Sequence, residues 1–313
     1  MPMGPVTIAA GIELPPAILA RFYNFHGREK TDAWLETIPS RLDEWLGTWR
    51  IEIEHAEPPD TVNLVLFGHS QLVGDVVLKL CPPTFESRAE IAALRLAAGD
   101  QVVRLIDADP TTSVLMLERI RPGTDLKTFG LSDEESTRIG AEKLLAFWRD
   151  PQPPDDLIPL ERWARELLDY KPRKRTELPE DLLTTGVEIA HELLKTQTNQ
   201  TLLHGDLHHQ NILWSSDQGW VTIDPKGLIG DRGYDIATWM MNPWTFPRHE
   251  DFLVLANRRL DVFAEMLGED RSRLAKWAVF HAALSLCWSL DVENPEDSQG
   301  DITFLRSMAR LLD

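Results

Sequence analysis

The segment TLLHGDLHHQNILWSSDQGWVTIDPKG, residues 201–227, interrupts a half of the chain that is otherwise patterned as helix. Largely apolar runs at 211–214 and 220–223 predict two short strands, and the Ser-Ser-Asp-Gln-Gly stretch between them predicts the turn of a hairpin. A polar loop, HGDLHHQN at 204–211, leads into the first strand. The sequence therefore predicts that a loop rich in side chains suited to proton transfer or metal binding is held at one end of a hairpin.

Three oxygen-bearing side chains of this segment are spaced so that they can meet at one point. Asp206 and Asn211 share the loop, and Asp224 follows the second strand. Asn211 and Asp224 suit Mg²⁺, which proteins bind through one or two carboxylates together with substrate phosphates and water. Asp206 is then left to accept a proton from an attacking hydroxyl group. The His-x-Asp-x4-Asn spacing with a downstream Asp is typical of phosphoryl-transfer sites.

The three histidines of the loop allow a different interpretation. His204, His208 and His209 could be zinc ligands, but structural zinc sites usually include cysteine, and Cys81 and Cys287 lie far away in apolar runs. We therefore favour a bracing role for His204 through hydrogen bonds. His208 and His209 could approach a substrate or fill polar space, and the sequence leaves both roles open. Two cysteines in apolar runs are typical of buried thiols in a reducing compartment.

Strand and helix patterns divide the chain near residue 120. The first part predicts an amphipathic helix, three strands of an antiparallel meander, one inserted helix and two further strands. Their ranges are 31–49, 49–55, 61–68, 74–81, 85–99, 101–109 and 112–120. The second part predicts helices near 132–149, 158–170, 179–196, 249–267, 271–290 and 301–312. We therefore expect an α+β fold with two lobes, an N-terminal arm and small antiparallel β lobe over residues 1–120, and a mainly helical lobe over 121–313 that carries the hairpin.

A lysine and a glutamate in the first lobe fit the same chemistry. Lys79 lies at the end of the third predicted strand, and Glu90 lies in the first turns of the helix that follows. Kinase-type phosphoryl-transfer sites carry a phosphate-binding lysine on the third strand and its glutamate partner on the next helix. Either residue alone would be unremarkable, since an isolated lysine most often lies on the surface. Their order relative to Asp206, Asn211 and Asp224 favours the functional interpretation.

Length and charge limit the classes of partner. At 313 residues the chain exceeds the size, about 250–300 residues, at which single cores usually divide. It carries 50 Asp and Glu against 32 Lys and Arg, a formal charge of -18. This balance argues against a nucleic-acid partner, because such binding depends on neutralising phosphates. The one basic run, at 171–175, is interpreted as a solvated loop. No signal-like segment and no apolar run of about 18 residues is present, so we expect a cytoplasmic protein with no membrane partner.

With these residues placed, the sequence resembles the aminoglycoside phosphotransferase superfamily of small-molecule kinases, and within it the streptomycin 6-phosphotransferase and hydroxyurea phosphotransferase branch. The resemblance covers roughly residues 48–290 and implies a protein-kinase-like fold with ATP and Mg²⁺ as cofactors. The stretches that carry it are VVLKL at 76–80, Glu90 before AALR, LMLERIRPGTDL at 115–126, LLHGDLHHQNIL at 202–213, IDPKGLIGDRGYDIATWM at 223–240 and WAVFHAALSLCWSL at 277–290.

The resemblance assigns a role to each matching residue. It implies that Asp206 is the general base, that Asn211 and Asp224 hold Mg²⁺, and that Lys79 contacts the α- and β-phosphates of ATP with Glu90 as its ion-pair partner.

It also implies that backbone groups around Glu118, Arg119 and Ile120 hydrogen-bond the adenine. Asp235 matches a structural aspartate that braces the catalytic loop, so we do not expect it to react. One feature departs from the pattern, because the turn HAEPPDT at 55–61 lacks the glycines that usually cover the phosphates.

The acceptor is less constrained than the nucleotide site. We expect a hydroxyl of a small molecule, of which a cationic aminoglycoside such as streptomycin suits the acidic chain. The alternatives are a metabolic kinase for choline, homoserine or a sugar, and a catalytically silent nucleotide-binding module. A protein kinase fits less well, because DPKG replaces Asp-Phe-Gly and no Ala-Pro-Glu segment follows. The sequence leaves the oligomeric state open. Candidate acceptor residues, for each of which surface or core packing is the favoured explanation, are Asp231, Trp239, Asn242, Trp244 and the stretch 291–293.

Overall fold

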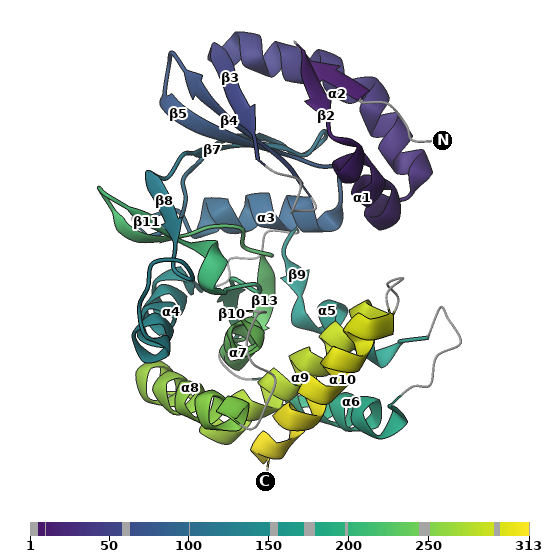
Figure 1. The fold of residues 1–313 in the computed structure, drawn as a ribbon, viewed down its shortest axis with the longest axis vertical. Coiled ribbons are helices and arrows are strands. Elements are labelled where there is room, and N and C mark those ends of the chain that lie inside the picture. Colours follow the sequence, from purple (N-terminus) through teal and green to yellow (C-terminus); the bar gives the residue numbers. More distant parts are fainter. Residues whose placement is uncertain are drawn as a thin grey trace.

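The fold has a lobe built on a β-sheet above a lobe built of helices (Figure 1). The computed structural model describes residues 6–9, 11–57, 63–99, 101–150, 156–171, 179–197, 200–243, 251–290 and 295–312. The predicted two-lobed α+β fold, with an antiparallel sheet first and helices after it, is confirmed. The exact division at residue 120 stays a prediction. Within the described residues, no helix combines the length and apolar character needed to cross a membrane.

The upper sheet contains five antiparallel strands. Its spatial order is β3 (Ile51–Ala56), β4 (Leu64–Ser70), β5 (Gly74–Leu80), β7 (Val114–Glu118) and β6 (Leu105–Asp109). Helix α3 (Phe85–Leu96) is inserted after β5 and runs along the sheet face that looks toward the lower lobe (Figure 1). Thr84 and Ser87 cap its first turn reciprocally. The predicted meander and inserted helix are therefore both present.

Side chains alternate along β5, so the two faces of this sheet contact different parts of the protein. Val76, Leu78 and Leu80 are buried in one apolar cluster with residues of the N-terminal helices, and Lys79 lies between them in the sequence. Because successive residues of a strand point to opposite faces, Lys79 points toward α3 instead. The strand thus buries an apolar row on its outer side and presents one lysine on its inner side.

The outer face of the sheet is covered by the N-terminal segment. It consists of β1 (Val6–Ala9), β2 (Ile12–Leu14), α1 (Pro16–His26) and α2 (Arg28–Trp49). The helix predicted at 31–49 is α2, but β1, β2 and α1 were not predicted. Trp34 of α2 is buried and donates its Nε1–H to the carbonyl of Thr112, 2.9 Å away. The segment is therefore a packed layer of the upper lobe.

The lower lobe is assembled around helix α9. This helix is buried along most of its length, and it packs against α5, α6, α7, α8 and α10. The prediction placed the start of α10 six residues too late, because its first turns are polar. The helices are α4 (Asp133–Phe147), α5 (Leu160–Leu168), α6 (Glu180–Lys195), α7 (Ala237–Met241), α8 (Asp251–Leu267), α9 (Arg271–Leu290) and α10 (Pro295–Ala309).

Two small sheets hold the 204–211 loop between them. One has the order β10 (Gln200–Leu203), β13 (Leu228–Asp231), β9 (Ile158–Pro159), and the other has the order β12 (Gly219–Thr222), β11 (Ile212–Ser215), β8 (Pro122–Asp125). Strands β11 and β12 pair from Ile212 with Thr222 to Ser215 with Gly219, which is the predicted hairpin. The loop leaves β10 and enters β11, so both of its ends are anchored by strands.

Candidate active site

The 204–211 loop is fixed from below by one buried carboxylate. Asp235 lies in the 3-10 turn before α7, and its Oδ1 accepts the backbone N–H of Gly205 at 2.6 Å. Its Oδ2 accepts the backbone N–H of His204 and the Nε1–H of Trp148, both at 2.9 Å. Burial raises the pKa of Asp235 to about 6, although these three donors act in the opposite direction. These hydrogen bonds tie the loop to the turn before α7, and the bracing role that the resemblance implied for Asp235 stays a prediction.

His204 links the loop to the end of the hairpin. Its Nε2 lies 3.0 Å from the carbonyl oxygen of Ile223, and its Nδ1 accepts the backbone N–H of Asp206 at 3.3 Å. Burial lowers the pKa of His204 to about 3, so the ring is neutral at physiological pH. A neutral ring with Nε2 as donor and Nδ1 as acceptor satisfies both contacts. His204 therefore orients the backbone at Asp206.

The other two loop histidines turn toward different partners. His208 accepts the backbone N–H of Gln210 through Nδ1 at 3.2 Å. The ring of His209 stacks on Trp239 with 4.0 Å between centroids, and burial lowers its pKa to about 3. Across the described part of the chain, no group of three or more His, Cys, Asp or Glu side chains could hold a metal ion. The zinc site considered from the sequence has no counterpart there.

The structure brings Lys79 together with Glu90 and Asp224. The Nζ of Lys79 lies 2.8 Å from Oε1 and 2.9 Å from Oε2 of Glu90, and 3.2 Å from Oδ1 of Asp224. Burial alone would lower the pKa of Lys79, but the charges of Asp224 and Glu90 raise it above its ordinary value. Partial burial would raise the pKa of Asp224, but the charge of Lys79 beside it holds this pKa below its ordinary value. A lysine of the upper lobe and a carboxylate of the lower lobe thus form an ion pair across the two lobes.

Asn211 connects the 204–211 loop to the end of the hairpin. Its Nδ2 donates to the backbone oxygen of Asp206 at 2.9 Å, and its backbone oxygen accepts the N–H of Ile223 at 3.0 Å. Ile223 directly precedes Asp224, whose positive φ of 58° turns the chain after β12. Because the amide nitrogen of Asn211 is committed to Asp206, its amide oxygen is the atom available for a ligand.

These residues fit the proposed magnesium site. The amide oxygen of Asn211 and the carboxylate of Asp224 are two hard oxygen donors at adjacent ends of a loop and a strand. Mg²⁺ is commonly held by so few protein oxygens, because substrate phosphates and water complete its octahedral shell. The donor set therefore suits Mg²⁺ bound together with a nucleotide.

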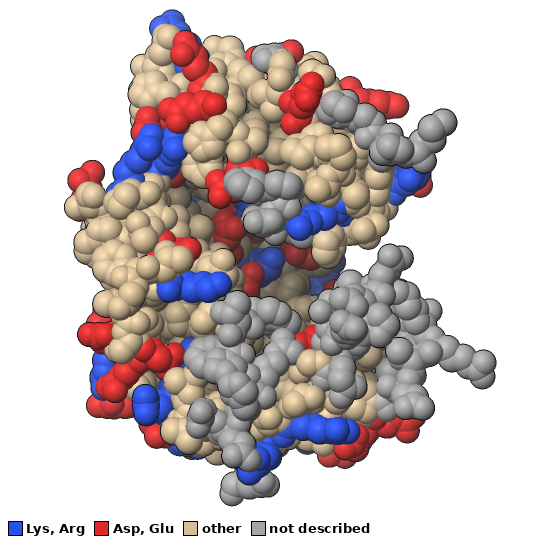
Figure 2. All heavy atoms as spheres, in the orientation of Figure 1, with Lys and Arg blue, Asp and Glu red and all other residues tan. Residues whose placement is uncertain are grey.

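The carboxylate of Asp206 faces a lysine that sequence reasoning did not single out. Oδ2 of Asp206 lies 3.7 Å from Nζ of Lys226, and both side chains are partly exposed. Figure 2 shows acidic and basic side chains gathered where the surface is hollowed between the two lobes. The only signal in the sequence was position, since Lys226 follows Asp224 by two residues in DPKG.

The connection between the lobes offers one uncommitted backbone donor among the three predicted adenine contacts. The N–H of Glu118 donates to the carbonyl of Arg104 at 3.0 Å, and that of Arg119 donates to the carbonyl of Asp75 at 3.2 Å. The N–H of Ile120 makes no backbone hydrogen bond within the described ranges. The side chains of Glu118 and Arg119 are engaged elsewhere in the upper lobe and hairpin. If adenine is recognised by a backbone donor here, Ile120 is the available one.

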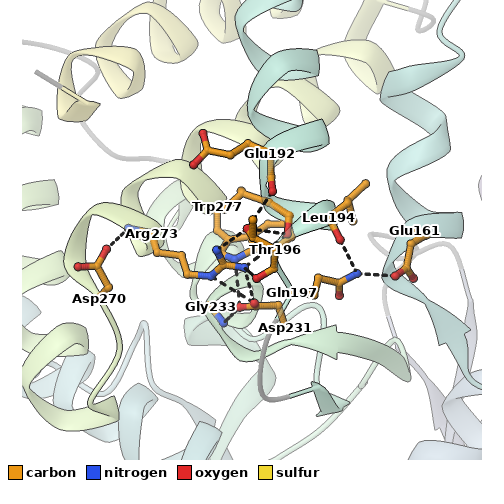
Figure 3. Close-up of polar contacts among 11 residues, drawn as sticks. Glu161, Glu192, Leu194, Thr196, Gln197, Asp231, Gly233, Asp270, Arg273 and Trp277 are labelled. Carbon is orange, nitrogen blue, oxygen red and sulfur yellow. Dashed lines mark hydrogen bonds and ion pairs between the residues drawn. The ribbon is translucent and has the colours of Figure 1, made fainter.

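The candidate acceptor residues differ sharply in their surroundings. Asp231 is buried, and it accepts hydrogen bonds from Arg273, at 2.5 and 3.2 Å, from Gly233 N–H and from the Trp277 indole (Figure 3). This network ties the start of α9 to the end of β13.

Trp239 is also buried and packs on His209. The geometry does not support the acceptor roles considered for Asp231 and Trp239, because their polar groups and surfaces are occupied by the protein. Asn242 is only partly buried, and its Nδ2 donates to the carbonyl of Thr238 at 2.9 Å, so its role stays a prediction. Trp244 and residues 291–293 lie outside the described residues.

Comparison with known proteins agrees with this architecture. The chain is 30% identical over 285 residues to a streptomycin 6-kinase of Streptomyces glaucescens, covering 90% of this chain and 92% of the relative. It is 27% identical over 290 residues to a hydroxyurea phosphotransferase of Kitasatospora aureofaciens, covering 91% and 82%.

Solved structures share the fold at low sequence identity. An aminoglycoside phosphotransferase in a ternary complex with ADP and hygromycin B superposes with a TM-score of 0.62 at 11% identity, over 86% of this chain and 97% of that one. A choline kinase from Streptococcus pneumoniae superposes with a TM-score of 0.60 at 13% identity, over 87% and 98%. Residues 49–293 match the family described as aminoglycoside/hydroxyurea antibiotic resistance kinase. The chain belongs to this kinase family.

Proposed function

We propose that this chain transfers the γ-phosphoryl group of ATP to a hydroxyl group of an aminoglycoside of the streptomycin type. Two relatives named streptomycin 6-kinase, at 30% and 28% identity, align with about nine tenths of the chain and support this substrate class. A metabolic kinase is the weaker alternative, since the choline kinases resemble this chain in fold at 18% identity or less. A silent binding module is not favoured, because each polar group needed for transfer is present.

One observation carries the proposal: Asp224, at the end of the hairpin, lies beside Lys79, and the hairpin starts from the loop that carries Asp206 and Asn211. Asn211 is hydrogen-bonded to Asp206, and Asp224 is 3.2 Å from Lys79. In the proposed site, Asp206 serves as the base, Asn211 and Asp224 as metal donors, and Lys79 as the phosphate-binding cation. Phosphoryl transfer requires mainly this kind of positioning and charge stabilisation, since the protein forms no covalent intermediate.

The proposed step begins with an acceptor hydroxyl beside the carboxylate of Asp206. The hydroxyl oxygen bonds to the γ-phosphorus, its proton passes to Asp206, and the bond between the γ-phosphorus and the bridging oxygen breaks, so that ADP leaves with the electron pair. Lys79, oriented by Glu90, would contact the α- and β-phosphates. Mg²⁺ held by Asn211 and Asp224 would neutralise charge on the phosphate oxygens.

The charge of the chain favours a cationic acceptor. Its formal charge is -18, and acidic clefts raise the local concentration of cations. Hydroxyurea is neutral, so the two substrate classes named among the relatives differ in this property. A cationic aminoglycoside should therefore bind more weakly as salt is added, whereas a neutral acceptor should not.

The function can be tested with a panel of acceptors. Purified protein with Mg·ATP is mixed with streptomycin, other aminoglycosides, hydroxyurea, choline or simple sugars, and ADP release is measured with and without the acceptor. We expect streptomycin to give the highest acceptor-dependent rate. Preferential turnover of choline or a sugar would replace the proposed substrate class, and ATP binding without turnover of any acceptor would support the silent module instead.

A further inference from the structure

Lys226 is held rigidly beside the reacting groups. Its backbone N–H donates to the carbonyl of His204 at 2.7 Å, which ties it to the 204–211 loop. A Cβ added to Gly205 would come within 3.1 Å of the Lys226 Cβ, so the loop packs closely on the base of this side chain. The next residue, Gly227, has a φ of 67° and packs against the carbonyl of Ala89 on α3. The lysine therefore extends from a backbone fixed on both sides.

The two lysines near the site differ in how their ammonium groups are used. Lys79 has 9% of its side chain exposed, and its Nζ is within 3.2 Å of three carboxylate oxygens of Glu90 and Asp224. Lys226 has 34% of its side chain exposed, and the carboxylate oxygen nearest to it among the described residues, on Asp206, lies 3.7 Å away. That distance is longer than a hydrogen bond. Lys226 thus keeps donors for another anion, whereas those of Lys79 are largely committed.

Stability does not explain why a lysine occupies this position. A partly exposed ion pair such as Lys226 with Asp206 contributes only ~0–1 kcal/mol, because water solvates both charges. A transferring phosphoryl group, by contrast, spreads negative charge over its three equatorial oxygens and gains from each cation fixed beside it. The ammonium lies next to Asp206, the carboxylate that would receive the acceptor's proton. The γ-phosphoryl group must pass close to that carboxylate during transfer.

We propose that Lys226 is a catalytic residue that donates a hydrogen bond to an equatorial oxygen of the γ-phosphoryl group while that group moves to the acceptor. This role rests on the proposed phosphotransfer. The bonds formed and broken are those of the proposed function: the new oxygen–phosphorus bond forms, the bridging bond to ADP breaks, and Asp206 takes the proton. Lys226 keeps its own proton throughout and supplies charge. Lys79 contacts the nucleotide before and after the step, whereas Lys226 contacts the γ-phosphoryl group during its transfer.

The role predicts that Lys226 matters more to the transition state than to the bound nucleotide. In the Lys226→Met variant we expect turnover with Mg·ATP and streptomycin to fall by about 10² to 10³, as when one fixed donor to a reacting oxyanion is removed. Affinity for Mg·ADP should change by less than about threefold, because the contact is absent from the ground state. Lys226→Arg should recover part of the lost turnover, since it restores the charge.

A readout without the acceptor separates this role from the identity of the substrate. ADP with Mg²⁺ and aluminium fluoride mimics the planar phosphoryl group, and its binding is compared by calorimetry with that of Mg·ADP alone. The wild-type chain should bind the mimic more tightly than Mg·ADP, and Lys226→Met should lose this preference. The matched control is Lys276→Met, since Lys276 is 32% exposed and pairs with Glu192 on the surface between α6 and α9.

The outcomes distinguish failure of the Lys226 role from failure of the proposed function. If Lys226→Met prefers the mimic as strongly as the wild-type chain does, or keeps turnover within about threefold, the role of Lys226 is wrong and the phosphotransfer stands. If the wild-type chain binds neither Mg·ADP nor the mimic, the proposed function itself fails and takes this role with it. Loss of folding in Lys226→Met, seen as a lost thermal transition that Lys226→Arg restores without restoring turnover, would show a structural lysine and overturn the proposal.

Discussion

Replacing Lys79 with methionine should destabilise the whole protein as well as abolish nucleotide binding. Lys79 and Glu90 are 7% and 8% exposed, and two contacts of 2.8 and 2.9 Å join them. Lys79→Met leaves the Glu90 carboxylate buried without its cation. Removing one partner of a buried pair costs about 3–5 kcal/mol, a large part of the roughly 5–15 kcal/mol that stabilises a typical domain. Asp224 adds little to this loss, because 40% of its side chain is exposed.

The magnitude can be measured by urea unfolding of a double-mutant cycle. Lys79→Met should lower the free energy of unfolding by about 3–5 kcal/mol, and Lys79→Met combined with Glu90→Gln should recover at least about 1 kcal/mol of that loss, because no charge remains buried alone. The exposed pair Lys276–Glu192 serves as control and should contribute less than about 1 kcal/mol. Strictly additive effects of the two substitutions at Lys79 and Glu90 would refute the buried ion pair.

Three further predictions concern the loop and its supports. The pKa of Asp235 is raised from 3.8 to about 6, so the folded state binds this proton more tightly than the unfolded state. The free energy of unfolding should therefore fall by about 2 kcal/mol as pH rises from 4 to 7, and urea unfolding should find this dependence missing in Asp235→Asn. Gly227→Ala would place a Cβ 2.3 Å from the carbonyl oxygen of Ala89, so it should lower the free energy of unfolding, measured by thermal unfolding, by at least about 2 kcal/mol. Gly74→Ala is the control and should cost less, because Gly74 shares a positive φ but an added Cβ would meet open space. Asp224→Ala should remove most of the increase in ATP affinity that Mg²⁺ gives, measured by titrating ATP with and without the metal; an unchanged increase would argue against Asp224 as a ligand.

Local patterns were sufficient for the parts of the fold that are formed by neighbouring segments. The alternation along β5 and the turn between β11 and β12 each depend on residues a few positions apart, so the meander and the hairpin could be predicted. The same holds for the spacing of Asp206 and Asn211 within one loop. The first helix was not predicted, although it begins at Pro16 and a proline in the first turn of a helix is well tolerated.

Contacts between distant segments could not be predicted in this way. Asp231 was considered for the acceptor, but Arg273, which lies on a different element 42 positions later, binds its carboxylate. Lys226 presents the reverse case, since its significance depends on the loop bringing Asp206 within 3.7 Å. No periodicity encodes either approach, because each results from how the strands and helices pack together.

The role of Asp206 is the central claim, and the turnover of Asp206→Asn with Mg·ATP and streptomycin tests it most directly. We expect turnover to fall by about 10² to 10⁴, because a positioned general base typically contributes that much, while ATP affinity stays unchanged. Asp217→Asn, in the exposed turn of the hairpin, is the matched control and should retain full turnover. Acceptor-dependent ADP release by Asp206→Asn at the wild-type rate would contradict the account.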